Sequence, residues 1–162
     1  METKILIRKI VADDNAALAI IIRSALKEFN ANKPGTVYFD NTTDSLSEIF
    51  KVKKSAYFVL EINGEIGGGG GYFPTKGLPE NTCELVKMYL SKKFRKKGFG
   101  QMLLEKCMAE AMKTGFEKMY IETMPELTNA ISMYEKNGFQ FIYAPLGNSG
   151  HTGCDVWMIK SL

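Results

Sequence analysis

One basic, glycine-containing run carries the clearest chemical signal in the sequence. Residues 90–101 read Leu-Ser-Lys-Lys-Phe-Arg-Lys-Lys-Gly-Phe-Gly-Gln, between a strand-like apolar stretch and a helix-like stretch. A turn in that place leaves backbone N–H groups unpaired at the start of the helix, where the helix dipole also favours negative charge. Gly98 and Gly100 let a ligand come close to the backbone. The run therefore predicts a binding site for a diphosphate.

Two better-known phosphate motifs do not fit this run. The dinucleotide fingerprint needs a third glycine, and the residue at that position is Leu103. The Walker loop needs a Gly-Lys-Ser or Gly-Lys-Thr triplet, and none follows. What remains is Arg-x-x-Gly-x-Gly, which by itself is equally compatible with a solvated basic loop. The elements around the run must therefore decide its meaning.

Hydrophobic periodicity predicts those elements. Strands are expected over residues 4–11, 57–62, 65–73, 82–90, 118–123, 139–143 and 154–159. Helices are expected after residues 13–15 and over residues 44–51, 99–114 and 126–136. The resulting order, β-α-α-β-β-β-α-β-α-β-β, is typical of a mixed α/β sheet with helices on both faces, and we expect one domain over residues 1–162.

Two details of the predicted strands concern the site. The five consecutive glycines at 67–71 weaken a strand and mark either a bulge or a place where another group approaches the backbone. Simple alternation along residues 82–90 places one set of side chains on one face, namely Leu85, Lys87 and Tyr89. It places the other set on the opposite face, namely Glu84, Val86, Met88 and Leu90.

The composition is that of a folded protein with an ordinary polar surface. Of the 162 residues, 45% are hydrophobic and 24% are charged, and the formal net charge is +3. That charge is too small and too diffuse for a nucleic-acid binder, whose wider basic surface would carry interleaved aromatic residues. No apolar run reaches membrane-spanning length, and the N-terminus lacks the form of a signal peptide. We therefore expect neither a nucleic acid nor a membrane as partner.

The cysteines indicate a reduced compartment. Cys83, Cys107 and Cys154 are odd in number and far apart, and no Cys or His pair has the spacing of zinc ligands. We therefore expect no bound metal and a cytoplasmic location.

Taken together, these features resemble the GNAT superfamily of acetyl-CoA-dependent N-acetyltransferases. Residues 95–100 are similar to that family's pyrophosphate-binding loop. Tyr134-Glu135-Lys136-Asn137-Gly138-Phe139 is similar to its Tyr-Glu-Lys-x-Gly-Phe signature. The element order is the third point of similarity, and the match spans nearly the whole chain. The resemblance implies a GNAT-like α/β domain whose mostly antiparallel seven-stranded sheet contains one splayed parallel strand pair.

The resemblance implies that the cosubstrate acetyl-CoA lies where strands 82–90 and 118–123 splay apart. Its pantetheine amides would pair with the first strand as an added strand does, and its pyrophosphate would accept from backbone N–H groups of the loop. The implied cofactor-binding residues are Met88, Tyr89, Leu90, Arg95, Lys96, Lys97, Gly98, Phe99, Gly100 and Gln101. The family often has an asparagine where this chain has Leu127, and Asn129 is expected to point elsewhere on the helix.

The family mechanism is direct attack of a neutral amine on the thioester. A base is needed, because a free alkylamine is protonated at pH 7. Glu84 and Glu122 are both candidates for that base, and the sequence leaves open which of them acts. Tyr134 is similar to the family's general acid, which protonates the leaving thiolate. In the loop at 147–155, His151 or Asp155 would lie near the acceptor amine, unless the loop is a plain turn between strands.

The acceptor is the least determined part of this interpretation. A small-molecule or peptide amine fits the resemblance, and Glu28, Tyr38 and Asp40 are candidates for the wall of its pocket. An alternative function is a non-catalytic module that binds or senses acyl-CoA, which would keep the loop but need no base or acid. The resemblance is also compatible with a homodimer.

Overall fold

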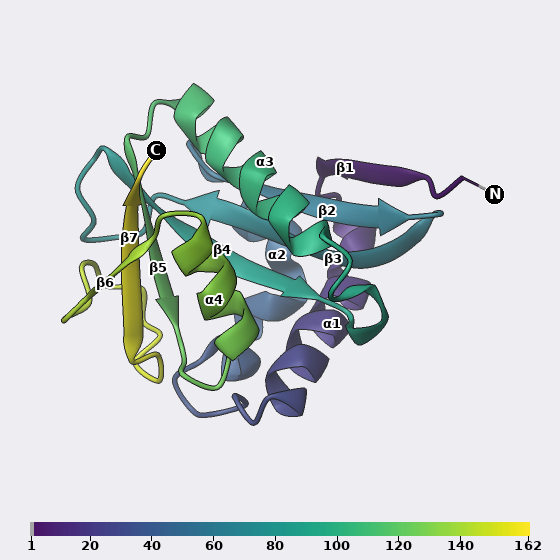
Figure 1. The fold of residues 1–162 in the computed structure, drawn as a ribbon, viewed down its shortest axis with the longest axis horizontal. Coiled ribbons are helices and arrows are strands. Elements are labelled where there is room, and N and C mark those ends of the chain that lie inside the picture. Colours follow the sequence, from purple (N-terminus) through teal and green to yellow (C-terminus); the bar gives the residue numbers. More distant parts are fainter. Residues whose placement is uncertain (1) are drawn as a thin grey trace.

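The structure is a computed structural model that describes residues 2–162. Over this range a seven-stranded mixed sheet has the strand order β1-β2-β3-β4-β5-β7-β6 (Figure 1). The strands are β1 (Ile5–Lys9), β2 (Ala56–Ile62), β3 (Glu65–Phe73), β4 (Thr82–Leu90), β5 (Lys118–Thr123), β6 (Gln140–Ile142) and β7 (Val156–Ser161). Among these described strands β4 and β5 form the one parallel pair, and every other pair of neighbours is antiparallel. The predicted fold class and element order are confirmed.

Helices cover both faces of the sheet. They are α1 (Asn15–Glu28), α2 (Leu46–Ile49), α3 (Phe99–Thr114) and α4 (Thr128–Lys136). In Figure 1 α3 and α4 lie in front of the sheet, and α1 and α2 lie behind it. Leucines and isoleucines at helical spacing bury one side of α1, as Leu103, Leu104 and Cys107 do on α3, so the sheet has an apolar core on each face. None of these helices combines the length and the apolar character that a membrane span needs.

The predicted boundaries hold best around the basic loop. β4, α3 and β5 begin and end where the sequence predicts. The helix expected over residues 44–51 is instead a 3-10 turn, Asn41–Ser45, followed by the short α2, because the Asp40 side chain accepts from the Thr42 N–H and tightens the turn. α4 begins at Thr128, two residues later than expected, because Leu127 closes a preceding turn onto Met124.

β4 contains a β-bulge that the sequence pattern did not predict. Gly69 pairs with Tyr89 and Gly71 pairs with Val86, so β4 carries one residue more than β3 over the same interval. The extra residue brings Lys87 into the left-handed conformation, with φ at 52°. The Tyr57 hydroxyl donates to the Lys87 carbonyl at 2.8 Å and holds the bulge in place.

The bulge reverses the alternation of side chains along β4. Leu85 before it and Met88 after it both pack in the core beneath α3. Tyr89 packs in the core on the opposite face, beneath α1, and lines the same small cavity as Glu84 and Lys87. Simple alternation had separated Glu84 from Lys87 and Tyr89, and that prediction is wrong because the extra residue shifts the later side chains by one position.

The glycines at 67–71 make room for this arrangement. A Cβ on Gly69 would lie 2.5 Å from Cε1 of the Tyr57 ring, and a Cβ on Gly71 would lie 2.4 Å from the Ala56 carbonyl oxygen. The glycine run therefore accompanies both a bulge in the partner strand and the close approach of a ring. β3 has a bulge of its own at Gly67, between the pairs Leu60 with Gly68 and Glu61 with Ile66, so both interpretations of the run are confirmed.

Replacing Gly71 with alanine is expected to lower the free energy of unfolding by about 2–3 kcal/mol, because the new Cβ overlaps backbone atoms of β2. Gly64→Ala is the matched control. Its φ is 82° but nothing lies within 4 Å of its Cβ, so only backbone strain of about 1 kcal/mol is expected. Urea denaturation measures both changes, and equal losses would contradict the explanation by packing.

Candidate active site

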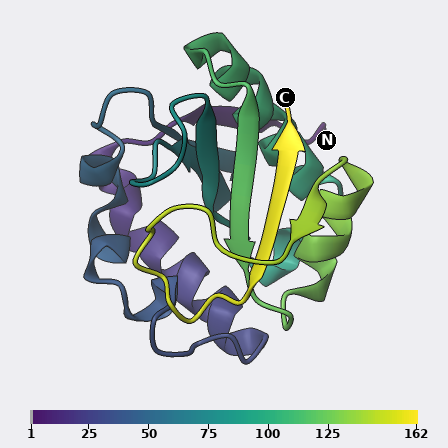
Figure 2. The ribbon, with the colours of Figure 1, turned by 90° about the vertical axis from the view of Figure 1, so that its left-hand side faces the viewer.

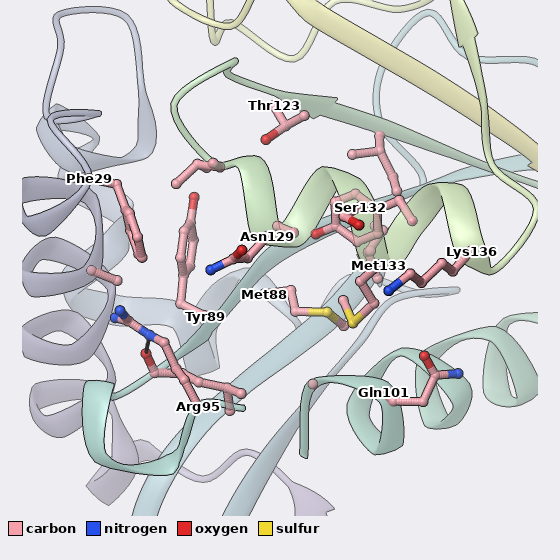
Figure 3. A pocket seen from close by; sticks show the side chains of 18 of the residues that line it. Phe29, Met88, Tyr89, Arg95, Gln101, Thr123, Asn129, Ser132, Met133 and Lys136 are labelled. Atoms are coloured by element: carbon pink, nitrogen blue, oxygen red, sulfur yellow. Dashed lines mark hydrogen bonds between the residues drawn. The ribbon is translucent and has the colours of Figure 1, made fainter. Parts of the chain in front are cut away.

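The parallel strands β4 and β5 pair only at their beginnings. The pairs are Thr82 with Lys118, Cys83 with Met119, and Glu84 with Tyr120. Beyond Glu84 the strands diverge, and a cavity of about 550 Å³ opens beside them (Figure 3). We call it the main cavity. Of the predicted cofactor-binding residues it is lined by Met88, Tyr89, Leu90, Arg95, Lys96, Gly98, Gly100 and Gln101, whereas Lys97 is exposed and Phe99 packs in the core.

The loop before α3 presents a row of free backbone donors to this cavity. Within the described residues, no hydrogen bond uses the backbone N–H groups of residues 96–101, and the first donor of the helix ladder is Met102, to Gly98. Lys96 and Gly98 have φ values of 61° and 86°, which curves the backbone into a concave nest. A Cβ on Gly98 would meet no protein atom, so the glycine serves the backbone conformation. These donors fit a phosphate anion.

Arg95 holds this loop against α1. Its Nε donates to the Leu90 carbonyl at 3.1 Å, its Nη1 lies 2.6 Å from Glu28 Oε2, and its guanidinium lies 4.8 Å from the centre of the Phe29 ring. Figure 3 shows this side chain at the α1 side of the main cavity. Glu28, predicted as a wall of the acceptor pocket, therefore supports the phosphate loop.

A second, smaller cavity of about 40 Å³ adjoins the main cavity. We call it the acidic cavity. Six residues line both cavities, namely Leu85, Lys87, Tyr89, Glu122, Thr123 and Leu127. In the acidic cavity Glu84, Glu122 and His151 each bring one polar atom within 4.8 Å of the others. Both candidate bases thus lie where the two strands part.

The two carboxylates have different surroundings. Glu84 is 3% exposed, and its Oε1 has no hydrogen-bond partner in the described chain. Burial and then the nearby charge of Glu122 raise the pKa of Glu84 to about 7, against smaller opposing effects of Thr75 and Lys87. Glu122 instead accepts hydrogen bonds from the Tyr120 hydroxyl, at 2.7 Å, and from Ser149. One carboxylate is therefore free to exchange a proton near neutral pH, and the other is held by two hydroxyls.

The Tyr-Glu-Lys-x-Gly-Phe signature fixes Tyr134 at the end of α4. Gly138, with φ at 92°, ends the helix, and the Phe139 N–H turns back to the Tyr134 carbonyl at 3.0 Å. The rings of Tyr134 and Phe139 then meet edge to face at 5.7 Å. Tyr134 and Tyr89 both line the main cavity, and burial raises the pKa of each phenol. In the described residues Tyr57, Tyr72 and Tyr120 use their hydroxyls in hydrogen bonds, but Tyr134 and Tyr89 do not.

The loop between β6 and β7 brings His151 to the acidic cavity. Figure 2 shows this loop crossing the end of β5 towards the connection after α1. The Gly153 N–H donates to the Gly35 carbonyl at 2.9 Å, and His151 Nε2 lies 3.2 Å from Asp40 Oδ2. The loop is thus a wall of the site and more than a plain turn. Asp155 and Tyr38 line neither cavity.

Comparison with known proteins agrees with this geometry. The family model described as Acetyltransferase (GNAT) family matches residues 21–139. The chain belongs to the GNAT family of acetyltransferases. This GNAT protein is 38% identical over 157 residues to a protein named uncharacterized N-acetyltransferase YjgM, from Escherichia coli K12, a match that covers 96% of this chain and 93% of that protein.

Solved structures share the fold of this acetyltransferase. A GNAT-family acetyltransferase from Staphylococcus aureus Mu50 aligns with a TM-score of 0.83 at 20% identity, over 98% of this chain and 99% of that one. The yncA protein of Salmonella typhimurium, solved with its cofactor acetyl-CoA, aligns with a TM-score of 0.75 at 20% identity, over 98% and 94% of the two chains.

The sequence did not predict the position of Asn129 in this GNAT protein. Asn129 lines the main cavity, and Figure 3 shows its amide turned towards Tyr89. Because α4 starts at Thr128, Asn129 falls in the first turn of the helix, above the separated strands. The expectation that it points elsewhere was wrong. Lys87 was also missed as a site residue, and the glycine run in β3 was the one signal of the bulge that places it.

The three thiols of the acetyltransferase are free and shielded. Cys83 and Cys107 are buried, and Cys154 is half-buried beside the acidic cavity. Burial raises the pKa of Cys83 and of Cys154 to about 12, and raises that of Cys107 as well. None of them is a ready nucleophile at neutral pH.

Glu84 is expected to make the stability of this acetyltransferase fall as the pH rises. Its pKa is about 7 in the folded state against an ordinary 4.5, so the folded state binds the proton more tightly. The stabilisation is complete below about pH 4.5 and is lost as the pH rises through 7, by about 3 kcal/mol in total. Urea denaturation between about pH 5 and pH 8 should show this loss in the wild type and not in Glu84→Gln.

The exposed Glu48→Gln variant is the control, and should keep the wild-type dependence on pH. If Glu84→Gln follows the same curve as the wild type, the raised pKa of Glu84 is refuted.

Proposed function

We propose that this acetyltransferase transfers the acetyl group of acetyl-CoA to a primary amine by direct attack of the amine on the thioester. The observation that carries the proposal is Glu84, a buried carboxylate whose Oε1 has no hydrogen-bond partner in the described chain, at the point where β4 and β5 separate beside a large cavity. A base with a pKa near the working pH is what amine acylation needs.

The main cavity supports the assignment of acetyl-CoA as cosubstrate. Its volume of about 550 Å³ suits a ligand of that class, and one wall is the edge of β4 left free by the separation of the strands. The backbone of Met88–Leu90 at this edge would pair with the pantetheine amides as an added strand does. The free N–H groups of residues 96–101 would take the pyrophosphate.

The proposed steps balance in protons and bonds. The acceptor enters as an ammonium and gives one proton to Glu84, which makes its nitrogen nucleophilic. The nitrogen attacks the thioester carbonyl carbon, so that the C–N bond forms and the C–S bond breaks. The thiolate takes a proton from the Tyr134 hydroxyl, and the second proton lost by the nitrogen restores that phenol. The products are the amide, the CoA thiol and one proton released from Glu84 to solvent.

Glu122 and Tyr89 have supporting parts in this proposal. Glu122, held by Tyr120 and Ser149, stays as a fixed negative charge beside the incoming ammonium. Tyr89 lines both cavities, so it would contact the acceptor and the cosubstrate where the two meet.

Glu84→Gln is expected to lower kcat about 100-fold and to remove the rise of kcat/KM with pH that ends near pH 7, because the variant lacks the base. Tyr134→Phe should lower kcat about 10-fold to 100-fold with little change in the KM for acetyl-CoA. Release of CoA with a panel of primary amines measures both effects. Glu48→Gln is the control and should turn over like the wild type.

Unchanged turnover in both Glu84→Gln and Tyr134→Phe would refute the assigned roles. Binding of acetyl-CoA without turnover of any amine would favour the non-catalytic acyl-CoA module.

Gly98→Ala is expected to weaken the binding of CoA about tenfold, because alanine is strained at φ 86° and its Cβ enters the space before the free N–H groups. Pantetheine lacks the pyrophosphate, so its affinity should be unchanged in the same variant. Calorimetry measures both affinities, with Gly64→Ala as the control at a remote left-handed glycine. An equal loss for CoA and pantetheine would contradict the assignment of the pyrophosphate to this loop.

A further inference from the structure

The acidic cavity carries more negative than positive charge. Of the residues that line it, Glu84 and Glu122 bear carboxylates, and Lys87 alone bears an ammonium or guanidinium group. Lys87 already has a partner, because its Nζ lies 3.8 Å from Asp40 Oδ2 and its side chain is only 7% exposed. Glu84 Oε1 has none within the described residues. The cavity therefore offers an unpaired carboxylate oxygen to a cation, whereas its one ammonium group is already paired.

Three polar atoms of the acidic cavity lie close enough together for one ammonium to reach all of them. An ammonium nitrogen with three acceptors at about 2.9 Å, in tetrahedral directions, holds those acceptors about 4.7 Å apart. A zinc ion with ligands at about 2.1 Å would need them about 3.4 Å apart. The polar atoms of Glu84, Glu122 and His151 all lie within 4.8 Å of one another, so one ammonium can contact all three, and the zinc titration described below tests the competing ion.

The walls limit what can accompany the ammonium. The acidic cavity measures about 40 Å³, against about 550 Å³ for the main cavity, so it admits a small group such as an ammonium while the rest of an acceptor extends into the main cavity. The loops that supply Val37 and His151 to its wall are tied together, since the Gly153 N–H donates to the Gly35 carbonyl and a Cβ on Gly35 would lie 2.7 Å from the Gly153 nitrogen. A carboxylate on the amine carbon would lie in or beside this small volume, next to Glu84 and Glu122, and their charges would repel it.

We propose that the acceptor is a primary alkylamine that binds as a cation, with no carboxylate on its amine carbon. Its ammonium lies among Glu84, Glu122 and His151, and its chain leaves through the side shared with the main cavity. This inference rests on the proposed acetyl transfer and narrows its substrate class. The same chemistry is found in free amines and in the side chain of a peptide lysine.

Matched pairs of amines test this selectivity, because each pair differs only in the carboxylate. Agmatine is compared with arginine, and tyramine with tyrosine, by CoA release from acetyl-CoA at one pH. We expect kcat/KM to be at least tenfold higher for the amine without the carboxylate in both pairs. A peptide with a blocked N-terminus and one lysine forms a third arm, and turnover there but not with the free amines would identify a peptide side chain as the source.

Glu122→Gln tests whether the charge of the cavity causes the preference. The variant keeps the size of the side chain and an oxygen for Tyr120, so we expect the KM for agmatine to rise at least tenfold while the KM for acetyl-CoA stays the same. Glu48→Gln, remote from both cavities, should change neither value. Circular dichroism confirms that the variant is folded, and calorimetric titration of the wild type with zinc tests the competing ligand.

Each outcome separates this inference from the proposed function. No CoA release with any amine would refute the acetyl transfer itself. Turnover in which arginine and tyrosine equal or exceed agmatine and tyramine would refute the inference and leave acetyl transfer in place. Zinc binding that depends on both Glu84 and His151 would also overturn it, because the cavity would then be a metal site.

Discussion

The hydrogen bond from the Tyr57 hydroxyl to the Lys87 carbonyl fixes the bulge on which the site depends. The extra residue in β4 brings Glu84, Lys87 and Tyr89 to the same small cavity, where regular alternation would divide them. The Tyr57 ring fits only because the neighbouring strand β3 has glycines there, since a Cβ on Gly69 or Gly71 would overlap it. A run of glycines that weakens one strand is therefore part of what assembles the site in the next.

This geometry gives the two carboxylates of the site different roles. Glu84 and Glu122 are near neighbours, and two adjacent charges in a buried place disfavour one another. The hydroxyls of Tyr120 and Ser149 donate hydrogen bonds to Glu122, and Glu84 Oε1 has no partner in the described chain, so Glu84 is the carboxylate that takes up a proton. The loops at 33–40 and 147–154 complete the wall, although neither carries a recognisable motif.

The sequence predicts those features that depend on residues close together in the chain. The strand, basic loop and helix over residues 82–114 were predicted correctly, because Gly98, Gly115 and the apolar spacing all act within a few residues. Glu84 and Glu122 could be chosen as candidates but not told apart, since Ser149 reaches Glu122 from 27 residues away. The bulge in β4 was not predicted, because the residues that signal it are the glycines of the neighbouring strand β3. Asn129 was misplaced because the start of α4 depends on a turn at Leu127.

The shielded cysteines have a practical meaning for anyone following the reaction. With the pKa of Cys83 and of Cys154 near 12, and that of Cys107 raised as well, almost no thiolate forms on the protein in a neutral buffer. A chromogenic disulfide reagent added to the mixture therefore reacts with the liberated cosubstrate in preference to the polypeptide. The background absorbance therefore stays low, and turnover can be recorded continuously in a photometer without alkylating or replacing any cysteine.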